Sequence, residues 1–114
     1  MEKFYKPNTV AILFNEKLGD SEDLANKIKN NISDDFEVFV QSVGVSLQNN
    51  LPSNPDLLIS IGGDGTILRC AKVLNGTNCP ILGINMGNVG FLCEIDSSDV
   101  DSKLQKYLSG DAVI

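Results

Sequence analysis

The string Gly62-Gly63-Asp64-Gly65-Thr66 is the part of the sequence best suited to chemistry. It directly follows the apolar run Asp56–Ile61. Glycines permit positive φ and close backbone approach, so the N–H groups of such a turn and of a following helix can bind a phosphate chain. A carboxylate among three glycines repels phosphate unless a cation lies between them or a hydroxyl bonds to it. The motif therefore predicts Asp64 as a group for a hydroxyl or a magnesium ion. The alternative is a tight turn in which Asp64 caps the helix.

Other chemistries are excluded by what the sequence lacks. No histidine is present, which removes imidazole bases, Ser-His-Asp triads and histidine-bound zinc. The P-loop string Gly-x-x-x-x-Gly-Lys-Ser/Thr is absent, and the dinucleotide fingerprint has Leu68 at its third glycine. The three cysteines, Cys70, Cys79 and Cys93, are odd in number and predict reduced core thiols. A carboxylate is therefore the expected base.

The composition bounds the setting in which this chemistry takes place. The 114 residues suit one domain, and a net charge of −6 argues against nucleic acid or an anionic membrane as a partner. No apolar run approaches the roughly 20 residues of a membrane span. We expect a cytoplasmic protein.

The elements that must position Asp64 alternate along the chain. Short apolar runs predict buried strands, and apolar residues at fourfold spacing predict helices. This order predicts an α/β fold: a Rossmann-like, doubly wound, mainly parallel sheet flanked by helices in a single domain, with ligands bound beyond the carboxyl ends of the strands. Strands are predicted at Thr9–Phe14, residues 36–40, Asp56–Ile61 and Pro80–Ile84, with a further one opening at residues 112–114. Helices are predicted over residues 21–32, 67–74 and 98–109, and a surface connection over residues 43–55.

A second glycine-bearing loop follows the strand that ends at Ile84. The string Gly83-Ile84-Asn85-Met86-Gly87-Asn88-Val89-Gly90-Phe91-Leu92, together with the motif at residues 62–66, resembles the two signatures of the amino-terminal domain of NAD kinases. The first signature is shared with diacylglycerol and sphingosine kinases and more loosely with 6-phosphofructokinases, whereas the second is typical of NAD kinases. A lipid kinase catalytic domain and a non-catalytic nucleotide-binding module are the alternatives.

The resemblance implies a reaction and roles for individual residues. The reaction is Mg²⁺-dependent transfer of a phosphoryl group from ATP or polyphosphate to the adenosine ribose 2′-hydroxyl of NAD. Asp64 would accept the proton of that hydroxyl, and Asp64 and Gly65 would contact the nucleotide. Arg69, the single arginine, would lie near the substrate, although it suits a helix surface equally well. The remaining expected binding residues are Gly62, Gly63, Thr66, Asn85 and Phe91; Asn85 could instead be a turn residue and Phe91 a core aromatic.

The resemblance also implies partners and a missing part. NAD kinases continue into a second, mostly β domain whose Asn-Glu or Asn-Asp motif binds the substrate ribose, so residues 1–114 correspond to the amino-terminal α/β domain. We expect NAD and ATP or polyphosphate as substrates, Mg²⁺ or another divalent cation as the cofactor, and a homo-oligomer. No residue is assigned as a metal ligand. We expect the chain alone to be inactive.

Overall fold

One parallel sheet organises the molecule. The computed structural model describes residues 7–44, 54–74, 78–86 and 95–96 and positions 100, 103, 104 and 108. The strands within these residues have the order β2-β1-β3-β4-β5 and are all parallel. Their bounds are β1 Thr9–Phe14, β2 Glu37–Ser42, β3 Leu57–Gly62, β4 Ile81–Asn85 and β5 Ile95–Asp96; the helices are α1 Ser21–Ile32 and α2 Asp64–Val73.

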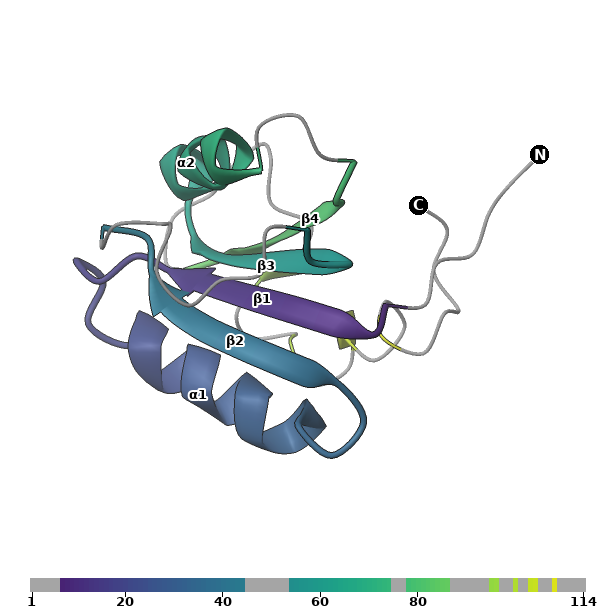
Figure 1. The fold of residues 1–114 in the computed structure, drawn as a ribbon. Coiled ribbons are helices and arrows are strands. Elements are labelled where there is room, and N and C mark those ends of the chain that lie inside the picture. Colours follow the sequence, from purple (N-terminus) through teal and green to yellow (C-terminus); the bar gives the residue numbers. More distant parts are fainter. Residues whose placement is uncertain are drawn as a thin grey trace.

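Helices cover both faces of the sheet because alternate strand residues point to opposite faces. Val10, Ile12 and Phe14 of β1 pack in one core cluster with the buried side of α1 and with the helical positions 100, 104 and 108. Ala11 and Leu13 of β1 pack in a second cluster with residues of α2. Figure 1 shows α1 and α2 on opposite sides of the strands. The predicted doubly wound, parallel α/β class is confirmed.

The strand order creates a crevice at the centre of the sheet. From β1 the chain passes through α1 to β2 on one side, and from β3 it passes through α2 to β4 on the other. The neighbours β1 and β3 therefore send their following loops to opposite faces. In sheets of this class the gap beyond the carboxyl ends of such a strand pair is the usual place for a ligand.

The structure corrects several element boundaries. Helix α2 begins at Asp64, three residues before the predicted start at Ile67, because Gly63 in extended backbone takes the position before the first turn. Strand β2 spans residues 37–42 rather than 36–40, and β5 was not predicted at all. The predicted strand opening at residues 112–114, most of the connection over residues 43–55, Phe91 and Cys93 lie outside the described residues.

Candidate functional site

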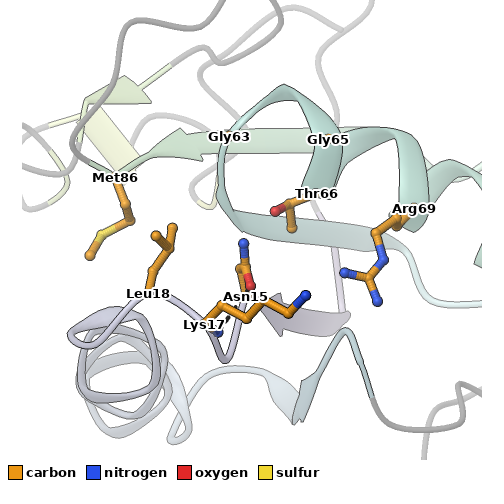
Figure 2. Close-up of a pocket in the computed structure, with 8 residues that line it drawn as sticks. All are labelled: Asn15, Lys17, Leu18, Gly63, Gly65, Thr66, Arg69 and Met86. Atoms are coloured by element: carbon orange, nitrogen blue, oxygen red, sulfur yellow. Dashed lines mark hydrogen bonds between the residues drawn. The ribbon is translucent and has the colours of Figure 1, made fainter.

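A pocket of about 330 Å³ lies beyond the carboxyl ends of β1, β3 and β4. Three loops meet there: the segment after β1, the turn from β3 into α2, and the residue after β4. Figure 2 shows the side chains around the space between these loops. The lining residues are Asn15, Lys17, Leu18, Gly63, Gly65, Thr66, Arg69 and Met86. The pocket occupies the crevice that the strand order creates.

The segment after β1 is held in shape by its own hydrogen bonds. Asn15 Oδ1 accepts a hydrogen bond from the Lys17 N–H at 3.0 Å, and the Asn15 N–H donates to the Ile61 carbonyl of β3 at 3.0 Å. The buried Ser21 hydroxyl donates to the carbonyls of Asn15 and Leu18. These bonds fix where Lys17 leaves the backbone at the edge of the pocket.

Gly62 needs to be glycine for a different reason from Gly63 and Gly65. A Cβ at Gly62 would collide with Thr66 Oγ1, and it would lie 2.9 Å from Thr66 Cβ and 3.3 Å from Asn15 Cβ. Gly62 is therefore required for packing. A Cβ at Gly63 or Gly65 would meet nothing within 4 Å, and neither residue has the positive φ that the sequence suggested. Because both residues line the pocket, their missing side chains keep its wall open for close approach to the backbone.

The pocket is locally cationic in an acidic chain. Among the described residues, Lys17 and Arg69 line it and no carboxylate does, although the chain carries a net charge of −6. The first-turn N–H groups of α2 add to this field, because a helix leaves those groups without an acceptor of its own. The lining therefore suits an anion with several oxygens, such as a phosphate chain.

Asp64 lies on a different side of α2 from the pocket. Helix positions are about 100° apart, which places Asp64 on a flank with Leu68 and away from Gly65 and Arg69. Asp64 is half-buried and is not among the lining residues, whereas Leu68 is 59% exposed. Asp64 thus lies outside the pocket lining, and its role toward a hydroxyl or a magnesium ion stays a prediction.

The other predicted site residues are distributed as follows. Gly63, Gly65, Thr66 and Arg69 line the pocket and Gly62 lies directly beside it. Asn85 ends β4 opposite Gly62, outside the pocket lining, and its buried Oδ1 has no hydrogen-bond partner within the part of the chain that the structure describes. Phe91 lies outside the described residues.

The cysteines and the acidic residues indicate no redox or metal centre among the described residues. Burial raises the pKa of the Cys70 and Cys79 thiols to about 11 in each case, which suits unreactive thiols. In the ranges that the structure describes, no three His, Cys, Asp or Glu side chains gather to hold a metal ion. None of the described helices combines the length and the apolar content needed to cross a membrane.

Comparison with known proteins decides the family. The family model described as ATP-NAD kinase N-terminal domain matches residues 3–112. The chain belongs to the NAD kinase family. The NAD kinase of Clostridium beijerinckii is 38% identical over 110 residues, which is 90% of this chain and 37% of that protein. The NAD kinase of Clostridium tetani is 42% identical over 76 residues, covering 67% of this chain and 28% of that protein.

Solved structures agree with the fold. A crystal structure of yeast NADH kinase complexed with NADH superposes with a TM-score of 0.76 at 19% sequence identity. The match covers 95% of this chain and 38% of the yeast chain. At this identity the similarity supports the fold alone. The chain thus spans between a quarter and two fifths of the length of these NAD kinase relatives.

Half of the pocket lining was not predicted as site residues: Asn15, Lys17 and Leu18 lie outside both signature strings, and Met86 lies within the second string but was given no role. A signal was nevertheless present: Asn15 and Lys17 directly follow the first buried strand. In a doubly wound sheet the loop after the first strand lies at the central crevice, so position in the topology could have identified them.

Proposed function

We propose that the pocket binds the phosphate chain of a phosphoryl donor and that residues 1–114 serve as the donor-binding domain of an NAD kinase. The observation that carries this proposal is the open space at Gly63 and Gly65. Neither packing nor backbone conformation requires glycine at these two positions, yet both border a pocket with two basic side chains. Close approach of a phosphate chain to the backbone gives a physical reason for both glycines.

The donor would be ATP or polyphosphate, and the acceptor the adenosine ribose 2′-hydroxyl of NAD. Asp64 would accept the proton of that hydroxyl, since it lies between Gly63 and Gly65 at the border of the pocket, where the acceptor would approach the end of the phosphate chain. The attacking and leaving oxygens would then lie roughly in line on opposite sides of the transferred phosphorus. Phosphoryl transfer depends on positioning more than on a strong base, so a carboxylate can take the proton late in the transfer.

A divalent cation fits this arrangement without a protein cage. Mg²⁺ usually takes one or two protein carboxylates and completes its shell with phosphate oxygens and water. Because no carboxylate lines the pocket among the described residues, the cation would be held mainly by phosphate oxygens and water, which leaves Asp64 as the proton acceptor. When bound, the cation neutralises charge on the transferring phosphoryl group.

The experiment uses a chimaera in which this chain replaces the matching part of the Clostridium beijerinckii NAD kinase. We expect NADP formation from NAD, ATP and Mg²⁺, and no phosphorylation of dispersed diacylglycerol. Asp64→Asn should lower kcat by about a hundredfold or more, the scale of a positioned proton acceptor. Asp23→Asn, an exposed position in the first turn of α1, is the matched control and should leave kcat unchanged. A folded Asp64→Asn chimaera with near-normal kcat would remove Asp64 from the proposed role.

A further inference from the structure

The Glu16 carboxylate binds the turn that follows β2. Ser42 Oγ donates a hydrogen bond to Glu16 Oε2 at 2.6 Å, and the Gly44 N–H donates to the same oxygen at 3.1 Å. The fit is close, because a Cβ at Gly44 would collide with the carboxylate. The hydrogen bond from Ser42 is the main reason why the pKa of Glu16 is lowered, so this carboxyl group is ionised at neutral pH.

Arg69 holds the same turn from the side of the pocket. Its Nη2 donates a long hydrogen bond, 3.4 Å, to the carbonyl of Val43, which lies between the two residues that bind Glu16. Val43 is itself 2% exposed and packs in the core cluster beneath α2, so its carbonyl is a fixed acceptor. The residue after Glu16 is Lys17, the other basic residue of the pocket.

The negative charge of Glu16 is by itself unfavourable for the binding of an anion in the neighbouring pocket. Glu16 lies close enough to Arg69 for the guanidinium to contribute to the lowering of its pKa. Its charge would repel a bound phosphate chain. Its role is structural instead, because it fixes the Ser42–Gly44 turn to which Arg69 is hydrogen-bonded.

We propose that Glu16 is a positioning residue for the phosphate pocket. Glu16 acts through the Ser42–Gly44 turn, which holds the Arg69 guanidinium at the pocket wall. This inference rests on the proposed function of the pocket. It makes a prediction opposite in sign to that of electrostatics alone. Removal of the carboxylate should weaken anion binding if Glu16 positions Arg69, and should strengthen it if Glu16 only contributes charge.

The test is calorimetric titration of the 114-residue chain with sodium tripolyphosphate at low ionic strength. Glu16→Ala should weaken binding about three- to tenfold, the scale of one hydrogen bond. Glu16→Gln should recover most of this loss, because the amide oxygen still accepts from Ser42 and Gly44. Glu22→Ala, an exposed position in the first turn of α1, removes the same charge outside the pocket lining and at a residue that, in the described part of the chain, makes no hydrogen bond to the Ser42–Gly44 turn, and it should not weaken binding.

Two further variants separate positioning from a general loss of structure. Ser42→Ala removes one hydrogen bond and keeps the carboxylate charge, and it should weaken binding in the same direction. In an Arg69→Ala background, Glu16→Ala should cause no additional loss, because the residue through which Glu16 acts is already gone. If Glu16→Ala does not fold, Ser42→Ala decides the question, and unchanged affinity in that variant overturns the inference.

The remaining outcomes distinguish this inference from the proposed function. Equal or tighter binding by a folded Glu16→Ala chain shows that Glu16 does not position Arg69, while the pocket assignment stands. No binding of tripolyphosphate by the unmodified chain overturns the pocket assignment and the inference with it. An additional loss from Glu16→Ala in the Arg69→Ala background also overturns the inference, since Glu16 would then act by another route.

Discussion

Replacement of the glycines around the pocket by alanine should separate folding from ligand binding. At Gly62 the added methyl collides with Thr66 Oγ1 and approaches Thr66 Cβ to 2.9 Å and Asn15 Cβ to 3.3 Å. Thr66 is buried in α2 and the Asn15 backbone is bonded to Ile61, so neither neighbour can move away easily and the overpacking should cost about 1–3 kcal/mol. At about 4 °C per kcal/mol for a domain of this size, Gly62→Ala should lower the Tm by about 4–12 °C.

Gly65→Ala should have the opposite combination of effects. Its Cβ meets nothing within 4 Å, and alanine is favoured over glycine within a helix, so the Tm should be unchanged or slightly higher. The methyl enters the pocket and keeps a phosphate oxygen from the backbone. The loss of one hydrogen bond to a charged group, about 1.5–3 kcal/mol, weakens tripolyphosphate binding about 10- to 150-fold.

The assay combines thermal melting by circular dichroism with calorimetric titration of tripolyphosphate. Gly19→Ala is the matched control, because Gly19 also has open space for a Cβ but lies outside the pocket lining. It should change neither quantity by much. Wild-type affinity in Gly65→Ala would refute the reasoning that the glycine keeps space for a ligand, and an unchanged Tm in Gly62→Ala would refute the packing argument.

Three other expectations concern Arg69, the isolated chain and the thiols. In the chimaera with the Clostridium beijerinckii enzyme, Arg69→Lys should raise the KM for ATP and leave the Tm nearly unchanged, because a point charge replaces a planar fork at an exposed position; a lower Tm with unchanged KM would mark Arg69 as structural. The isolated chain should form no measurable NADP from NAD, ATP and Mg²⁺ and should bind NAD at best with a millimolar Kd; turnover at a rate typical of kinases, about 1–100 per second, would contradict this. At pH 8, Cys70 and Cys79, each with a pKa of about 11, should react with iodoacetamide about a hundredfold more slowly than a free thiol of pKa 9.0; residue-resolved mass spectrometry measures the rates, and labelling at the rate of a free thiol would show that the two are not shielded.

The spacing of apolar residues predicted most of the fold, because buried parallel strands and amphipathic helices have different apolar patterns. Residues 9–14 read as a continuous apolar run, and the structure has them as the interior strand β1, with five of its six residues buried. Ile28 and Ile32 at fourfold spacing lie on the buried side of α1, together with Ser21 and Ala25. The start of α2 was misplaced because Gly65 and Asp64 are poor helix formers, and the sequence does not reveal that Gly63 takes the capping position. Strand β5 has two residues, too few for any period to register.

Only the residues of the glycine motif and the nearby Arg69 were predicted for the pocket, because only this motif forms a recognisable pattern in the sequence. The glycine motif identified one wall of the pocket, since glycine, aspartate and threonine in such a string have few other uses. The opposite wall comes from Asn15 and Lys17, which are ordinary surface residues by type and acquire significance only from the order of strands. The separation of Asp64 from the pocket also could not be foreseen, because it depends on which residue begins the helix. The roles of Asn85 and Phe91 stay predictions.

The central claim is that the crevice between the loop after β1 and the first turn of α2 binds a phosphate chain. The most direct measurement is titration of the ¹⁵N-labelled chain with tripolyphosphate, followed by two-dimensional NMR. The account predicts saturable shifts of the backbone amides of Lys17, Gly63, Gly65 and Thr66 and of the Arg69 side-chain Nε–H, and much smaller shifts at Lys27 and Lys29 on α1. Shifts confined to the lysines of α1, or absent from Gly63 and Gly65 at saturation, would contradict it.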